Sequence, residues 1–279
     1  MPRRYSRTHS LLIVLSFMAI NSSVLAVAPV FDAHLHYNKE DTVRYLPEDI
    51  LSILSENSVD RAVVTGRPAS LAMQLQELAP HRIIPILGVY RNLADKSTWM
   101  YDNSLPVRVE QQLAKQFWRG IGELHIFARD RHSPVFLRLV ELAAARRIPL
   151  LMHCDPVVID ALFEHASDVT VIWAHAGAYP YPPLLRDYLE RYPGLHMDLS
   201  VRDERIAPSG EIESSWELLL MEFPDRFLVG VDTYSTARWK DYPKAISRTR
   251  AWLKQLPPEA AAAISRENAE RLFSRRPRD

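Results

Sequence analysis

The sequence predicts an α/β fold, a single-domain (β/α)8 TIM barrel. Short apolar runs typical of strands alternate with amphipathic helical stretches along the 279 residues, and this alternation builds parallel βαβ units. Eight such units fit into about 250 residues, the usual size of a closed barrel. The competing fold is a doubly wound open sheet, which usually needs fewer strands, and no G-x-G-x-x-G motif follows the first strand here.

The predicted strands are short runs rich in Val, Ile, Leu and Phe. They cover residues 30–36, 61–65, 83–89, 120–125, 149–153, 169–175, 195–199 and 226–232. The predicted helices follow them in order and have apolar residues on one face. They cover residues 47–57, 70–78, 107–117, 134–146, 157–165, 183–191, 214–223 and 242–256, with a last helix over 259–273. Prolines stand at loops and helix starts, and no Pro/Gly/Ser-rich linker divides the chain.

The first 26 residues have the pattern of a secretory signal. Arg3, Arg4 and Arg7 precede an apolar run over 11–20, and small residues follow at 24–28 without any acidic residue. The run of ten is too short for a membrane-spanning helix, which needs about 20 residues. We expect cleavage after Ala26, a barrel domain over 27–279, and a secreted or periplasmic protein that meets the membrane only during export. An uncleaved interfacial anchor is the alternative.

Composition excludes several classes of protein. The hydrophobic fraction of 47% argues against disorder. The single cysteine excludes a disulfide framework and a cysteine-based zinc cage. Lys+Arg and Asp+Glu both number 34, so no basic footprint suggests nucleic-acid binding. Removing the three arginines of the signal leaves 31 basic against 34 acidic residues, a mildly acidic mature chain.

Polar residues end five of the predicted strands, where barrel enzymes place their catalytic groups. They are His34 and His36, Glu123 and His125, His153, His175, and Asp232. Side chains two residues apart share a face of a strand, so His34 and His36 are expected to point inward together. Ala33 and Leu35 are expected to point outward, toward the helices.

These side chains are typical ligands of a divalent transition metal such as zinc or manganese. His34, His36, His153 and Asp232 would surround one ion, whose bound water becomes hydroxide near neutral pH. Asp232 is also the candidate base, and His175 would polarise a substrate carbonyl or bind a second ion. Each residue could instead have a purely structural role, such as a helix cap for Asp232. Polar residues at five strand ends together favour a metal site.

The motifs resemble those of the amidohydrolase superfamily, in the amidohydrolase-related branch that includes aminocarboxymuconate-semialdehyde decarboxylase. The matching segments are Phe31-Asp-Ala-His-Leu-His36, Gly120-Ile-Gly-Glu-Leu-His125, Leu151-Met-His153, Trp173-Ala-His-Ala-Gly177, His196-Met-Asp-Leu-Ser200, Gly230-Val-Asp-Thr233 and Asn268-Ala-Glu-Arg-Leu-Phe273. The resemblance implies His34, His36, His153 and Asp232 as ligands and His175 as a ligand or catalytic residue.

One departure leaves the number of metal ions open between one and two. Many binuclear members carry a carbamylated lysine on the fourth strand, where this chain has Glu123 and His125. A glutamate there is similar to TatD-type and some phosphotriesterase-like barrels, and Glu123 could bridge two ions.

Four residues after predicted strands are candidates for substrate binding. Arg91, Arg129 and Arg202 could each grip a carboxylate or phosphate, although any one could be a solvated loop residue. Tyr179 begins a stiff aromatic loop over 179–183 that could form the wall of a pocket.

The sequence thus predicts a hydrolase in which metal-activated water attacks an amide, ester or lactone carbonyl of a small molecule. His175 would steady the oxyanion and Asp232 would carry the proton to the leaving group. The alternatives are a metal-dependent decarboxylase, a two-metal phosphoesterase, and a barrel that binds a ligand without catalysis.

Overall fold

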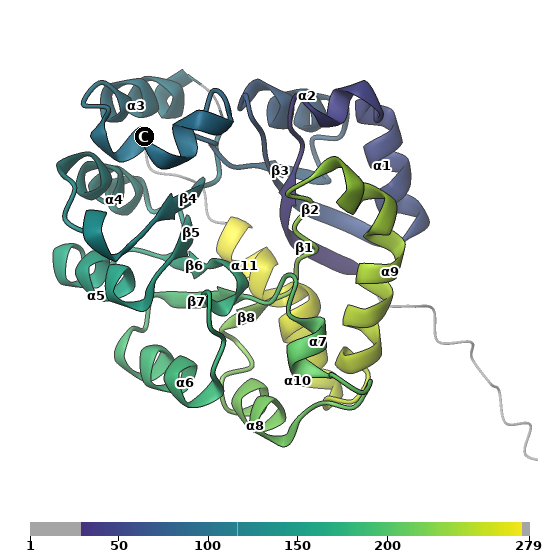
Figure 1. Ribbon diagram of the computed structural model, residues 1–279. Helices are drawn as coiled ribbons and strands as arrows, with labels where there is room; N and C mark the ends of the chain where they lie inside the picture. The colour runs from purple at the N-terminus through teal and green to yellow at the C-terminus, as the bar shows by residue number, and fades with distance from the viewer. Residues whose placement is uncertain (1–28, 116, 275–279) are drawn as a thin grey trace, which may run out of the picture.

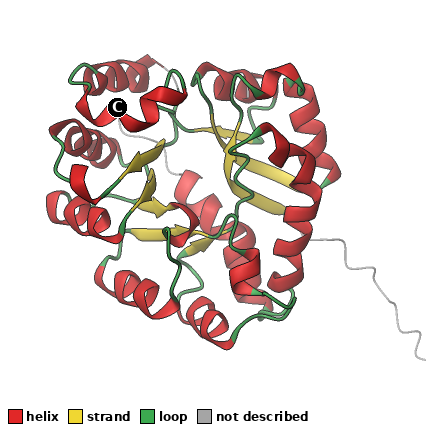
Figure 2. Cartoon of the chain, viewed as in Figure 1, coloured by secondary structure: helices red, strands yellow, loops and turns green. Residues whose placement is uncertain are grey.

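The computed structural model describes residues 29–115 and 117–274, so the predicted signal over 1–26 lies outside the described residues. Parallel strands surround a common centre, and helices cover their outer side (Figures 1 and 2). The strands are β1 (Val30–His36), β2 (Val59–Thr65), β3 (Ile83–Pro85), β4 (Ile121–Ile126), β5 (Leu150–Cys154), β6 (Val171–Trp173), β7 (Leu195–Asp198) and β8 (Phe227–Leu228). Within this part of the chain, no helix is both long and apolar enough to cross a membrane.

A helix follows each strand, as the alternating pattern predicts. The outer helices are α1 (Pro47–Glu56), α2 (Ser70–Leu78), α3 (Leu105–Lys115), α4 (Pro134–Arg146), α5 (Pro156–His165), α6 (Pro182–Arg191), α7 (Asp203–Ile206), α8 (Ser214–Glu222) and α9 (Thr236–Leu253). Proline occupies the first turn of α1, α4, α5 and α6, where its missing N–H costs no hydrogen bond. Two C-terminal helices complete the fold, α10 (Pro258–Ala262) and α11 (Asn268–Ser274).

The strands pair in two parallel sheets, β1-β2-β3 and β4-β5-β6-β7-β8. Backbone hydrogen bonds join the two sheets at both seams. At one seam, the Leu87 N–H donates to the Gly120 carbonyl over 2.8 Å. At the other, the N–H groups of Ala33 and Asp232 donate to the carbonyls of Val229 and His34, each over 2.8 Å. The predicted single-domain (β/α)8 barrel is therefore confirmed.

Asp32 ties the second seam to the outer helix α9. Its carboxylate is fully buried and accepts hydrogen bonds from the backbone N–H of His34, the backbone N–H of Val231 and the Tyr242 hydroxyl. Burial raises the pKa of Asp32 to about 7, although these donors oppose the shift. The carboxylate thus fixes the backbone from which His34 and Asp232 project.

The core has two layers. Most buried apolar side chains lie between the strands and the outer helices, while a smaller cluster fills the ring. That inner cluster includes Phe31, Ala33 and Ile172, together with Leu272 and Phe273 of α11. Figure 1 shows α11 crossing the middle of the ring, so the apolar filling leaves the other end of the barrel for polar side chains.

The expectation that Ala33 faces the helices is wrong, whereas the one for Leu35 is right. Ala33 belongs to the inner cluster and Leu35 to the outer one. The register of β1 against β2 shifts between Asp32 and Leu35, and an irregularity of this kind breaks strict alternation. The shift lets Ala33 fill the ring while His34 still reaches the site.

Several predicted boundaries also change. Strands β3 and β8 are shorter than expected. The continuation of β3 pairs with β4 only at an isolated bridge between Leu87 and Ile121, and that of β8 is joined to β1 by two separate hydrogen bonds. Helix α9 starts at Thr236 and accommodates Pro243 in its interior. The single helix expected over 259–273 is three segments, with a π-helical turn at Ala263–Glu267 between α10 and α11.

Replacing Gly122 with alanine is expected to destabilise the barrel by about 2 to 4 kcal/mol, through a strained φ and an overlap with packed backbone. Gly122 has a φ of +138°, and a Cβ there would overlap the carbonyl oxygen of Leu151. Gly210→Ala is the matched control, because Gly210 also has a positive φ (+86°) but no atom within 4 Å of the added Cβ. Denaturant unfolding of both variants measures the difference, and equal losses would contradict the overlap.

Candidate metal centre

Histidines and carboxylates from six strands meet at the carboxyl end of the ring. The members are His34, His36, Glu123, His125, His153, His175, Asp198 and Asp232. His34 and Asp198 are fully buried, and His36, Glu123, His175 and Asp232 are at most 7% exposed. The structure therefore brings together every histidine and carboxylate that the sequence analysis proposed for the site.

Asp198 orients the ring of His34. Its Oδ2 lies 2.7 Å from Nδ1 of His34, so Nδ1 carries the donated proton. The Nε2 lone pair of His34 would then be available to a metal ion. A carboxylate behind a histidine in this way is typical of metal ligands, because it fixes the tautomer and the ring orientation. Gly230 makes room for the pair, since a Cβ there would lie 2.8 Å from both His34 Cβ and Asp198 Oδ1.

Ser200 orients the ring of His175. The Ser200 hydroxyl donates to Asp198 over 2.6 Å, and its oxygen lies 2.8 Å from Nδ1 of His175. The hydroxyl hydrogen is used, so Nδ1 of His175 is the donor and Nε2 of the neutral ring faces the centre. His175 and Asp232 both have a positive φ, of 59° and 55°, and strained backbone of this kind concentrates at functional sites.

The facing atoms fit a shared cation. Nε2 of His36 lies 3.1 Å from Nε2 of His34 and 3.2 Å from Oδ1 of Asp232. Oδ1 of Asp232 is nevertheless a buried oxygen without a hydrogen-bond partner among the described residues. Leaving a buried carboxylate oxygen unsatisfied is costly, and a divalent ion between these nitrogen and oxygen atoms would remove the cost.

Glu123 stands between two groups of ligands. Its Oε1 lies 3.1 Å from Nδ1 of His153 and 3.3 Å from Nε2 of His175. Its Oε2 lies 3.5 Å from Nε2 of His36. The two oxygens therefore face different histidines, as the carboxylate of a bridging ligand would. His153 has a 35% exposed side chain and marks the open side of the site.

His125 is held at the edge of the cluster. Its Nε2 lies 3.2 Å from the Lys96 ammonium and 3.4 Å from Oε2 of Glu123, and its Nδ1 lies 3.2 Å from the Tyr90 hydroxyl. Burial lowers the pKa of His125 to about 3, in spite of the nearby Glu123 carboxylate. The ring is thus neutral, and both of its nitrogens have protein partners.

The carboxylates give the centre an excess of negative charge. Burial lowers the pKa of His34, but Asp232, Asp198 and Glu123 outweigh it and raise that pKa to about 10. Burial raises the pKa of Glu123, but the surrounding histidines hold it well below its usual value. Without a metal, the ring of His34 therefore stays protonated and supplies the positive charge of the cluster at neutral pH.

We expect the metal-stripped protein to lose stability as the pH rises from about 6.5, the ordinary pKa of histidine, to about 10. When folding raises the pKa of a histidine, its protonation stabilises the folded protein. The stabilisation is complete at pH values below the pKa in the unfolded chain, and it is lost as the pH rises through the pKa in the folded protein. The metal-loaded protein should lack this loss, because the ion replaces the proton. Thermal melts of both forms across this range measure the difference, and parallel pH profiles would contradict it.

The candidate substrate residues lie apart from this cluster or support it. Arg91 and Arg129 have exposed side chains, 69% and 76%, and pair with the carboxylates of Asp95 and Asp130. Tyr179 is 85% exposed. Arg202 is half-buried and donates to the carbonyls of His175 and Gly177 over 2.7 and 2.8 Å, so it holds the turn that carries His175. Substrate binding by these four residues stays a prediction.

Sequence reasoning missed Asp198 and Ser200, which orient two of the histidines. Asp198 ends β7, so the rule that identified the other strand ends would also have found it. Lys96 and Tyr90 were missed as well, because both lie in the segment between β3 and α3, where no spacing rule relates them to the strand ends.

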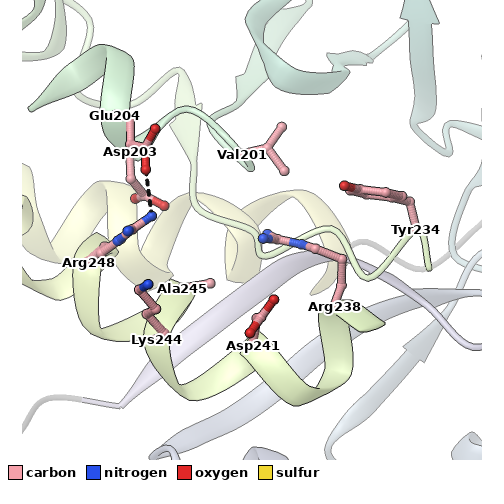
Figure 3. Close-up of a pocket in the computed structure, with 9 residues that line it drawn as sticks. All are labelled: Val201, Asp203, Glu204, Tyr234, Arg238, Asp241, Lys244, Ala245 and Arg248. Carbon is pink, nitrogen blue, oxygen red and sulfur yellow. Dashed lines mark hydrogen bonds and ion pairs between the residues drawn. The ribbon is translucent and has the colours of Figure 1, made fainter. Parts of the chain in front are cut away.

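A separate surface pocket lies between α7 and α9, next to the segments that follow β7 and β8 (Figure 3). Its lining mixes both charge signs, and Arg248 pairs with Glu204 over 2.8 Å. Arg238 also lines the pocket and donates to the Val231 carbonyl over 2.7 Å. None of its nine lining residues belongs to the histidine and carboxylate cluster.

The comparisons with known proteins agree with this geometry. The model of a family described as Amidohydrolase matches residues 101–275, more than half of the chain. The chain belongs to the amidohydrolase family. This family membership makes the protein an enzyme of the metal-dependent hydrolase type, and the buried cluster fits the metal site that such enzymes generally have.

One solved structure supports the fold of this amidohydrolase. A Xaa-Pro dipeptidase with methionine bound in its active site is similar with a TM-score of 0.50 and 11% identity, over 88% of this chain and 75% of that one. An amidohydrolase from Mycobacterium avium subsp. paratuberculosis K-10 has a TM-score of 0.45 and 14% identity, over 81% and 73% of the two chains. No curated protein matches the sequence.

Proposed function

We propose that this amidohydrolase hydrolyses an amide, ester or lactone carbonyl of a small molecule. The observation that carries the proposal is the unpartnered Oδ1 of Asp232, buried 3.2 Å from Nε2 of His36 at the carboxyl end of the barrel. Hydrolysis at such a centre needs a base beside the attacking water. With Oδ1 of Asp232 facing the ion, the other carboxylate oxygen, Oδ2, would take up that proton.

We propose zinc as the ion. Its ligands would be His34, His36, Glu123, His153 and Asp232. When bound, zinc would activate water and polarise the substrate carbonyl. Asp198 and Ser200 hold His34 and His175 in the tautomers that present Nε2 to the centre. Asp232 would accept a proton at Oδ2 and return it to the leaving group. Nε2 of His175 lies 3.7 Å from Oδ2 of Asp232, which is longer than a hydrogen bond, so the two side chains are neighbours without a direct proton contact.

Two other activities use similar residues. A decarboxylase of the same branch would release CO₂ without consuming water. A two-metal phosphoesterase has a specific observation in its favour, because the two oxygens of Glu123 face different histidines. A metal-to-protein ratio near two would be consistent with it, and a ratio near one would count against it.

A substrate panel on the zinc-loaded enzyme separates these activities. We expect turnover of at least one amide, ester or lactone, with no CO₂ released from carboxylic acids and no phosphate from phosphoesters. Turnover confined to decarboxylation or to phosphoesters would overturn the proposal in favour of that activity. A stably bound metal with no turnover on any class would favour a non-catalytic binding barrel.

We also propose export of the enzyme through the predicted signal over residues 1–26. The basic start, the short apolar run and the small residues before Val27 support it. N-terminal sequencing of the protein from a secreting host should give Val27 as the first residue. An intact N-terminus in the cytoplasmic fraction would contradict export.

A further inference from the structure

A small cavity beside the metal centre is lined by hydrogen-bond donors that hydrolysis does not use. We call it the Lys96 cavity. His36 and Glu123 of the metal centre contribute to its lining, and so do Arg67, Tyr90 and Lys96. The last three come from the segments that follow β2 and β3, so they lie outside the strand-end ligand set.

Lys96 is a partly buried cation without a carboxylate partner. Its ammonium contacts Nε2 of His125 over 3.2 Å, and within residues 29–115 and 117–274 no carboxylate forms an ion pair with it. An ammonium can only donate hydrogen bonds, so Nε2 of His125 is the acceptor. A partly buried ammonium that makes one bond to a neutral ring has two further N–H groups to offer.

The Tyr90 hydroxyl has a hydrogen to offer for the same reason. Because Nε2 of His125 accepts from Lys96, its Nδ1 carries the ring proton and donates it to the Tyr90 oxygen over 3.2 Å. The backbone N–H of His125 donates to the same oxygen over 2.7 Å. Both acceptor positions of that oxygen are used, so the O–H of Tyr90 remains available as a donor.

Arg67 adds a second cation to the Lys96 cavity. Its side chain is only 13% exposed. Among the residues that the structure describes, its ion pair is with Glu40 over 3.0 Å, and the Glu40 side chain is 60% exposed. A guanidinium has five N–H donors in a planar fork, so the bond to Glu40 leaves most of them free. Two cations and a phenol therefore face a cavity whose single carboxylate, Glu123, belongs to the metal centre.

We propose that the Lys96 cavity binds a carboxylate of the substrate, so that the enzyme acts on an acid whose scissile carbonyl lies a few bonds from that carboxylate. The proposal rests on the proposed hydrolase function and specifies its substrate class. It assigns recognition of the carboxylate to Lys96, Tyr90 and Arg67. The arginines proposed from the sequence for such an anion lie elsewhere, with Arg91 and Arg129 already paired at the surface.

A pair of chromogenic esters tests the assignment. Mono-4-nitrophenyl succinate and methyl 4-nitrophenyl succinate share one scissile ester, but only the first carries a carboxylate. We expect the zinc-loaded enzyme to prefer the acid at least tenfold in kcat/KM, and Lys96→Met to remove that preference mainly through KM. Lys244→Met is the matched control, because Lys244 is an exposed lysine of α9. An unchanged preference in Lys96→Met would overturn the proposal.

A binding measurement without turnover tests the carboxylate site separately from the hydrolase activity. Calorimetric titration of the metal-stripped protein with glutarate measures carboxylate binding when no ion can ligate it. We expect at least tenfold weaker binding in Lys96→Met, a smaller loss in Tyr90→Phe and none in Lys244→Met. Lys96-dependent glutarate binding in a protein that turns over no amide, ester or lactone would overturn the proposed hydrolase activity and keep the anion site. Equal hydrolysis of both esters, unaffected by Lys96→Met, would overturn the anion site and keep the hydrolase.

Discussion

Replacing Asp232 with asparagine is expected to lower kcat by about 10²- to 10⁴-fold, the range that loss of a positioned base produces. The amide has almost the same shape as the carboxylate, but it cannot take up the proton that the Asp232 carboxylate accepts in the proposed hydrolysis. The substitution also removes one negative charge from the neighbourhood of His34, so the pKa of His34 should fall from about 10.

Steady-state kinetics at matched metal content measure the effect of Asp232→Asn. Asp241→Asn is the control, because Asp241 is an exposed residue of α9 that lines the pocket between α7 and α9. A variant that binds its metal normally and retains more than a tenth of the wild-type kcat would show that Asp232 is not the base.

Asp198→Asn is expected to weaken metal binding by about 10- to 100-fold, the usual effect of losing a partner behind a histidine ligand. The Asp198 carboxylate accepts from His34 Nδ1 and from both the hydroxyl and the backbone N–H of Ser200. An amide oriented with its oxygen toward one of these donors presents its NH₂ group to another. The rings of His34 and His175 then lose the bonds that present their Nε2 atoms.

Competition against a chromophoric chelator measures the affinity of Asp198→Asn, with circular dichroism to establish that the variant is folded. Asp187→Asn is a suitable control, since Asp187 lies on the outer helix α6 with a 59% exposed side chain. Wild-type affinity in a folded Asp198→Asn variant would mean that the histidines need no carboxylate support.

Much of the fold could be predicted because a parallel barrel requires a regular pattern of apolar residues along the chain. Each strand is buried on both faces and reads as an apolar run, and each helix shows one apolar face. The ring then places the ends of distant strands together, so that His36 and Asp232, far apart in the sequence, lie 3.2 Å apart. Strand-end position alone was therefore enough to find the ligand candidates.

The rest depends on contacts that spacing does not encode. The inward turn of Ala33 follows from a register shift between β1 and β2, which local alternation cannot reveal. Lys96 reaches His125 from a loop, and nothing near it in the sequence marks that contact. The ion pairs of Arg91 with Asp95 and of Arg129 with Asp130 could have been predicted from the sequence, because each acidic residue lies within four residues of its arginine.

Elemental analysis of the purified protein shows whether the histidine and carboxylate cluster is a metal site. We expect stoichiometric divalent metal in the wild-type protein and its loss from the His34→Ala/His36→Ala variant. A double variant of the outlying histidines, His81→Ala/His132→Ala, should keep the metal. These two control residues take no part in the cluster. Stoichiometric metal retained by the folded His34→Ala/His36→Ala variant would show that the cluster does not hold the metal.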